Sequence, residues 1–161
     1  MDRRSLLKSL AAAGAVALLP DADAFAAWTR VASGVRVANG LSDAQLARIS
    51  TIADALLPRT DTPSATDVGV PAFVDVIVSE NYTDADRAAC VANLDAIDPT
   101  ALDAIEAADR RAEPQRTYWR LKGLIVHGYF TSERVMKDVL HYEVMPGRFD
   151  GSAAMASVRH G

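Results

Sequence analysis

Residues 42–58 read SDAQLARISTIADALLP, in a chain of 161 residues. Ser42 and Gln45 fit a capping box, in which the serine side chain accepts a hydrogen bond from the Gln45 backbone while the glutamine side chain reaches back. Apolar residues then recur at helical spacing up to Pro58, which cannot continue a helix. They are Leu46, Ile49, Ile52, Ala53, Leu56 and Leu57. The pattern predicts an amphipathic helix between Ser42 and Pro58.

A loop of Thr, Asp, Pro and Ser follows from Arg59 to Gly69, and a second helix is expected after it. Pro71 suits the first helical position because its missing N–H would have no partner there. The apolar residues of this segment are Phe73, Val74, Ile77 and Val78. Its β-branched residues also allow a strand, which is the alternative interpretation.

The remaining segments also favour helices. Thr83 caps one whose apolar stripe is Ala88, Val91, Leu94 and Ile97. A short helix is expected from about Thr100 to Ala108, with Leu102 and Ile105 inward.

Pro114 opens a longer helix, in which Gly123 and Gly128 permit close backbone approach. Its candidate core residues are Tyr118, Leu121, Leu124, Ile125 and Phe130. Thr131 or Ser132 caps a final helix with Val135, Met136, Val139 and Leu140. The predicted fold is all-α, a compact single domain of about five to six helices with an irregular C-terminal arm.

The N-terminus has the pattern of a twin-arginine export signal. Two arginines precede a short apolar run from Ser9 to Leu19, too short to span a membrane. The motif residues are Arg3, Arg4, Leu6 and Leu7, flanked by Asp2, Ser5 and Lys8. Two overlapping Ala-x-Ala sites follow, at residues 22–24 and 24–26. The default expectation is a signal peptide that is cleaved. A retained anchor, or a basic start to an amphipathic helix, is the alternative.

The expected organisation is therefore a signal peptide over 1–26, a flexible leader over 27–40, a helical domain over 41–151 and a tail over 152–161. The formal net charge is −4, without a cluster of Lys or Arg, which argues against a nucleic-acid partner. Cys90 is the single cysteine, so no internal disulfide can form. We expect its side chain to be buried, and a bond to another chain is the alternative.

The residues that could carry chemistry are few. His127, His141 and His160 are the only histidines, and no pair of them has the spacing of a metal site. Phosphate-binding and nucleophile motifs do not occur. Asp103, Glu106 and Asp109 have the spacing of a solvated helical face. The sequence predicts no catalytic, cofactor-binding or metal-binding residue in this chain.

The C-terminal part instead has the composition of a docking segment. Pro146 and Gly147 favour a turn, and the residues around them belong to types enriched in interface cores. These are Tyr142, Met145, Arg148 and Phe149. An ordinary arm folded on its own domain explains the composition equally well.

Several segments, in this order, resemble the gluconate 2-dehydrogenase subunit 3 family. They are residues 41–46, 55–65, 69–75, 128–133 and 142–151. The family comprises small, or gamma, subunits of FAD-dependent sugar dehydrogenases. The resemblance covers about residues 41–151.

The resemblance implies a complex. A large flavoprotein of the glucose-methanol-choline type oxidises a sugar or polyol, and a cytochrome c subunit commonly accepts the electrons. FAD is then expected in the large subunit and haem c in a third subunit, with no cofactor in this chain. The twin-arginine translocase is a further partner, and the expected location is the periplasm, or the membrane through the complex. Because FAD is inserted in the cytoplasm, the loaded flavoprotein must cross folded, and this chain can escort it.

The resemblance and the residue types together give a hypothetical partner interface. Its first part, expected to position the C-terminal segment, is Tyr129, Phe130, Thr131, Ser132 and Glu133. Its second part, expected to contact or orient the flavoprotein, is Tyr142, Pro146, Gly147, Arg148 and Phe149. In the alternative interpretation, Tyr129 and Phe130 are core residues. The alternative functions are a self-contained periplasmic helical enzyme and a free-standing binding module or chaperone.

Overall fold

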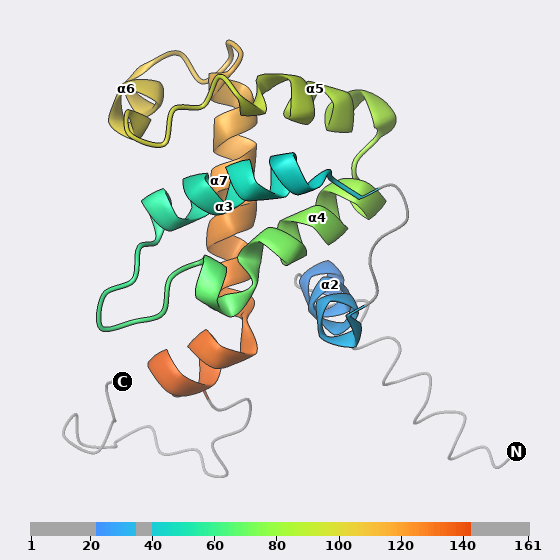
Figure 1. Ribbon diagram of the computed structural model, residues 1–161, viewed down its shortest axis with the longest axis vertical. Helices are drawn as coiled ribbons and strands as arrows, with labels where there is room; N and C mark the ends of the chain where they lie inside the picture. The colour runs from blue at the N-terminus through green and yellow to red at the C-terminus, as the bar shows by residue number, and fades with distance from the viewer. Residues whose placement is uncertain (1–21, 35–39, 143–161) are drawn as a thin grey trace, which may run out of the picture.

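The structure is a computed structural model, and it describes residues 22–34 and 40–142. These residues form helices joined by loops, with no strand among them (Figure 1). The helices are α2 (Ala22–Ser33), α3 (Asp43–Leu56), η1 (Thr66–Val68), α4 (Val70–Asn81), α5 (Asp84–Leu94), α6 (Leu102–Ala107), α7 (Gln115–Thr131) and η2 (Val135–Val139). The predicted all-α fold is confirmed, and residues 70–81 form a helix rather than the alternative strand.

Some predicted residues lie outside the described part of the chain. They are Arg3, Arg4, Leu6 and Leu7 of the export signal, Pro146, Gly147, Arg148 and Phe149 of the interface, and the tail 152–161.

α4 and α7 are the central helices. α4 packs against α2, α3 and α7, while α7 also contacts α2, α3, α5, α6 and η2. Figure 1 shows α7 running along the molecule, with α5 and α6 at one end and η2 at the other. α7 therefore connects the two ends of the domain.

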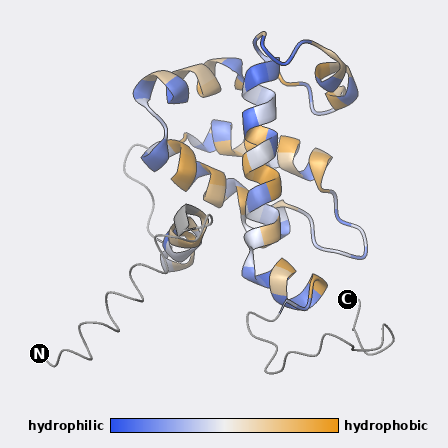
Figure 2. Cartoon of the chain, turned by 180° about the vertical axis from the view of Figure 1, so that it is seen from behind, coloured by the Kyte–Doolittle hydropathy of each residue, from blue (hydrophilic) through white to orange (hydrophobic). Residues whose placement is uncertain are grey.

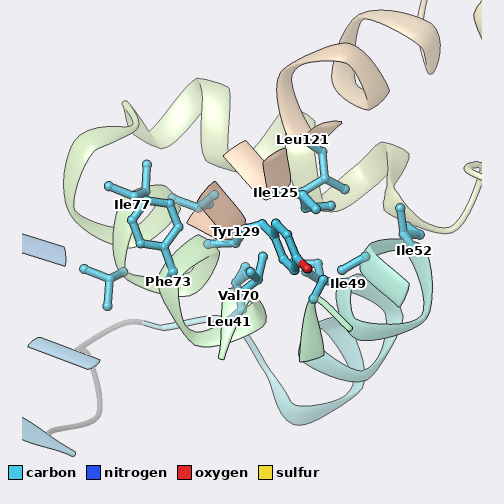
Figure 3. Close-up of a cluster of buried hydrophobic side chains, with 14 of the residues drawn as sticks. Leu41, Ile49, Ile52, Val70, Phe73, Ile77, Leu121, Ile125 and Tyr129 are labelled. Carbon is cyan, nitrogen blue, oxygen red and sulfur yellow. The ribbon is translucent and has the colours of Figure 1, made fainter. Parts of the chain in front are cut away.

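The core lies where α3, α4 and α7 meet. Residues 73–78 of α4 are all buried, as expected for a helix covered on every side. Figure 2 shows the hydrophobic residues gathered in this region, and Figure 3 shows the side chains that fill it. The predicted residues found buried are Ile49, Ile52, Ala53, Phe73, Val74, Ile77, Val78, Cys90, Leu94, Ile97, Ile105, Tyr118, Leu121, Ile125 and Val135.

Three predicted core residues are exposed instead. Phe130 and Leu140 each expose 45% of their surface, and Ala88 is also exposed. Phe130 follows Ile125 by five residues, which places it about 140° around α7 from the buried face. Leu140 comes directly after η2, beyond the buried Val135.

Local signals set the helix ends as predicted. Ser42 and Gln45 form the capping box, with the Ser42 N–H donating to Gln45 Oε1 at 2.8 Å and the Gln45 N–H donating to Ser42 Oγ at 3.3 Å. Thr83 caps α5 by accepting from the Asp86 N–H. A long-range bond also fixes the start of α3, because the Leu41 N–H donates to buried Asp75 Oδ1 at 2.7 Å. Asp75 thereby ties α3 to α4.

The predicted flexible leader is wrong for residues 27–33, which belong to α2. The Trp28 ring stacks on Phe73 at 5.2 Å, and Trp28 Nε1 donates to Thr131 Oγ1 at 3.0 Å. Arg30 pairs with Glu80 across the same contact. The helix ends at Gly34, whose φ of +66° suits glycine. Burial against residues distant in sequence therefore decides the conformation of this segment.

Within residues 22–34 and 40–142, no helix has both the length and the apolar character needed to cross a membrane.

Candidate functional site at the end of α7

Tyr129 is a core residue that supports the end of α7. Its side chain is 5% exposed, and its hydroxyl donates to the Pro63 carbonyl at 2.8 Å. This bond joins α7 to the loop between α3 and η1. The loop is further fixed by Asp67, which pairs with Arg59 and accepts from the Ser64 N–H. The backbone N–H of Ser64 is the main cause of the lowered pKa of Asp67.

The hydroxyl groups of Thr131 and Ser132 form hydrogen bonds with other parts of the same chain. Thr131 Oγ1 accepts from the Trp28 indole and donates to the His127 carbonyl at 2.7 Å. Ser132 is buried; its hydroxyl donates to the Tyr129 carbonyl at 2.8 Å and accepts from the Val135 N–H at 3.4 Å. Ser132 therefore ends α7 and caps the next helical segment, as predicted for Thr131 or Ser132.

Three large apolar residues remain exposed at this end of the molecule. We call them the C-terminal surface: Phe130, Leu140 and Tyr142. Phe130 packs edge-on against Tyr129 with the ring centroids 5.3 Å apart, and Tyr142 is 55% exposed. Figure 1 shows the last turn of α7 leading directly into η2. Contiguous exposed apolar patches mark interaction sites, and the three residues of the C-terminal surface lie within 13 positions of the chain.

The backbone at the end of η2 fixes the position of Tyr142. η2 is a π-helix, in which the Leu140 N–H donates to the Val135 carbonyl at 2.9 Å. His141 has φ +47°, in the left-handed region, and the Tyr142 N–H reaches back to the Met136 carbonyl at 2.8 Å. The left-handed residue and the bond back into the helix resemble a Schellman helix end, but the bond reaches one residue further back than in that motif.

Glu133 is exposed and forms an ion pair with Lys137 one turn later. The hydrogen bond that Lys137 donates within this ion pair lowers the pKa of Glu133. Of the first five predicted interface residues, Phe130 and Glu133 are therefore at the surface, Tyr129 and Ser132 are buried, and Thr131 binds Trp28.

A groove of about 660 Å³ lies elsewhere, between α7 and the junction of α4 with α5. It is lined by Asn81, Tyr82, Thr83, Asp86, Trp119, Arg120, Gly123, Leu124 and His127. Arg120 and Asp86 form an ion pair at 2.8 Å, which lowers the pKa of Asp86. The Trp119 ring is covered by the Arg110 guanidinium at 3.7 Å. The charged groups of Arg120 and Asp86 in the groove therefore bind each other, and the Trp119 ring is covered by Arg110.

A polar cluster joins α6 to α7. Glu106 accepts from the Tyr118 hydroxyl and from Lys122 Nζ, each at 2.5 Å. The bond from Lys122 is the main cause of the lowered pKa of Glu106, while burial raises the pKa of Tyr118. The predicted solvated face is therefore wrong for Glu106, whose carboxylate binds residues of α7. Asp103 and Asp109 are exposed, as predicted. The spacing of acidic residues could not reveal Tyr118 and Lys122 as the partners of Glu106.

Cys90 and His127, whose side chains could also carry chemistry, are packed against the rest of the domain. Cys90 is buried as expected, and burial raises the pKa of its thiol. His127 lies beside Phe73, with ring centroids 6.2 Å apart. Across residues 22–34 and 40–142, no three residues of the types His, Cys, Asp and Glu are grouped to hold a metal ion.

Comparison with known proteins gives two matches. Residues 43–108 match the family described as gluconate 2-dehydrogenase subunit 3, and residues 1–20 match the twin-arginine translocation pathway signal sequence. No curated protein and no solved structure matches the chain. The first match runs from the start of α3 to just beyond α6, so the C-terminal surface lies outside it. The two matches confirm the predicted family resemblance over residues 43–108 and the predicted export signal. The predicted segments 128–133 and 142–151 lie outside the first match.

Proposed function

We propose that this chain, which over residues 43–108 belongs to the gluconate 2-dehydrogenase subunit 3 family, is the non-catalytic small subunit of an exported FAD-dependent sugar or polyol dehydrogenase. It binds a large flavoprotein of the glucose-methanol-choline type, stabilises it and escorts it through the twin-arginine route. The complex works in the periplasm or on its membrane. FAD belongs to the large subunit, and haem c belongs to a third subunit where one is present.

The observation that carries this proposal is the presence of both matches on one chain. A subunit of a dehydrogenase family also bears its own twin-arginine signal. The large subunit must take up FAD in the cytoplasm, and the twin-arginine route accepts folded cargo. A small subunit with the signal can therefore carry a loaded partner that has none.

The C-terminal surface supports a docking role. Phe130, Leu140 and Tyr142 are exposed, while the buried residues Tyr129 and Ser132 at the end of α7 are held by internal hydrogen bonds. Aromatic residues on a rigid support lose little conformational entropy on binding. A stable interface buries roughly 800 Å² on each partner, more than three side chains provide. We therefore include Arg148 and Phe149, which follow in the sequence, in the proposed contact.

Co-expression with the flavoprotein tests the proposal. We would tag this chain, purify it with and without the candidate large subunit, and measure flavin absorbance and sugar-dependent dye reduction. The expected result is co-purification of an active, FAD-containing complex, while this chain alone has neither flavin nor activity. Dye reduction by the chain alone would instead support a self-contained enzyme. Failure to co-purify would support a free-standing binding module.

The proposed contact has its own test within the same complex. The variants Arg148→Ala and Phe149→Ala should co-purify less flavoprotein than the unchanged chain. Normal co-purification and normal exported activity of both would remove these two positions from the interface.

A further inference from the structure

The helix α2 contains both predicted signal-cleavage sites. The sites are Ala22-Asp23-Ala24 and Ala24-Phe25-Ala26, and α2 runs from Ala22 to Ser33. Ala24 belongs to both sites, as the last residue of the first and the first of the second. Its surface is only 3% exposed. The small residue that a signal peptidase must recognise at either site is therefore covered by the folded domain.

The helix is held on the domain by contacts beyond the cleavage sites. Ala27 is 2% exposed, and Trp28 stacks on Phe73 while its indole donates to Thr131. Arg30 adds an exposed ion pair with Glu80. These contacts join α2 to α4 and to the end of α7. The segment around Ala24 cannot leave the helix without weakening this docking.

We propose that the folded domain protects its own signal-cleavage sites, so that removal of the signal from the folded chain is limited by the unwinding of α2. Proteases cut segments that are exposed and free of backbone hydrogen bonds. When opening and closing are fast, the cleavage rate is proportional to the population of the open state. The contacts of Trp28 set that population here.

The export route makes this protection relevant. A twin-arginine signal carries a folded chain, so α2 is already docked when the sites reach the peptidase. Cleavage after Ala26 would also leave a positive ammonium group at the start of the shortened helix, where the helix dipole disfavours it. The signal consequently stays attached to the folded chain while α2 is docked. This inference requires the export signal but not the proposed dehydrogenase partner.

The test compares cleavage rates of the folded full-length chain by purified signal peptidase in detergent. Trp28→Ala should be cut at least about tenfold faster than the unchanged chain, because the docking contact is lost. Thr131→Val removes the acceptor of the indole N–H, together with the Thr131 hydroxyl bond to the His127 carbonyl within α7, and should accelerate cleavage roughly fivefold. Thr29→Ala is the matched control on the exposed face of α2 and should be cut no faster. A peptide of residues 1–34 should be cut fastest.

Hydrogen exchange separates local from global effects. In Trp28→Ala the amides of α2 should exchange faster while those of α4 keep their protection, and Thr131→Val serves if Trp28→Ala does not fold. Equal cleavage of the unchanged chain and both variants, whether fast or absent, would overturn the proposal. A peptide of residues 1–34 that is not cut would also overturn it, since the two sites would then not be cleavage sites.

Discussion

At the scale of single residues, Tyr129 stabilises the fold, whereas its neighbour Phe130 is available for binding. Tyr129 is buried and bonded to Pro63, while the neighbouring Phe130, about 100° further around α7, is half exposed. Their order in the sequence does not reveal this difference. It follows from the position of each residue around the helix, and it makes the pair a natural test of the C-terminal surface.

We expect Tyr129→Phe to lower the free energy of unfolding by about 1 kcal/mol, because the Pro63 carbonyl loses its donor. Binding to the flavoprotein should be unchanged. Phe130→Ala should do the reverse, weakening binding at least about tenfold while changing stability by less than about 1 kcal/mol. Urea unfolding and titration of the purified large subunit measure the two effects. Equal affinity of Phe130→Ala and the unchanged chain would exclude Phe130 from the interface.

The two glycines of α7 provide a second matched pair. A Cβ added at Gly128 would lie 2.7 Å from Phe73 Cδ1. A Cβ added at Gly123 would have no packing atom within 4 Å. Phe73 is fully buried beneath Trp28, so its ring has no room to move aside. Gly128→Ala should therefore destabilise the domain by about 1–3 kcal/mol.

Gly123→Ala should stabilise the domain by roughly 0.5–1 kcal/mol, because alanine favours the helix. Thermal unfolding of the two variants compares them directly. Similar changes for both would mean that Phe73 does not pack against Gly128 as described.

At the scale of elements, local sequence signals predicted most helices correctly. The N-cap residues, the prolines and the apolar spacing lie within a few residues of the helix ends that they set, as at Ser42 and Thr83. α2 was missed because its stabilising contacts are not local. Trp28 binds Thr131, which lies 103 residues away. The apolar character of Phe130 and Leu140 predicted core positions, but Phe130 lies off the buried face of α7 and Leu140 lies beyond the end of η2.

The contact of α6 with α7 should depend on pH. α6 has six residues with one buried side chain, Ile105, so its docking relies on the bonds of Glu106 to Tyr118 and Lys122. The folded state lowers the pKa of Glu106 below its usual value of 4.5. A lowered pKa contributes stability above the unfolded pKa, and this contribution is lost as the pH falls through the folded pKa.

Glu106→Gln should therefore be less stable than the unchanged chain at pH 7. The difference should shrink as the pH falls below 4.5. Thermal unfolding by circular dichroism across this range measures it, and near-identical spectra at pH 7 would show that both chains are folded. A difference that stays constant with pH would contradict a role for the Glu106 carboxylate charge.

At the scale of the whole molecule, an export signal and a helical domain with an exposed apolar end form one chain. The proposed function joins these parts: the signal directs export, and the C-terminal surface holds the cargo. The resemblance of residues 43–108 to the family could be predicted from the sequence, because several of the segments that carry it occur in order. The C-terminal surface could not be predicted from the sequence. Neighbouring residues of similar type, such as Tyr129 and Phe130, differ in burial, and only the folded chain shows which one is exposed.

The central claim is that the signal of this chain exports the flavoprotein. Arg3→Lys with Arg4→Lys keeps the charge but removes the paired arginines. We would co-express this variant with the large subunit and measure sugar-dependent dye reduction in the periplasm and the cytoplasm. The control makes the same exchange at two exposed positions of the domain, Arg111→Lys with Arg134→Lys. If this chain escorts the flavoprotein, the control has periplasmic activity and the activity of the signal variant is confined to the cytoplasm. Periplasmic activity with the signal variant would contradict the escort role.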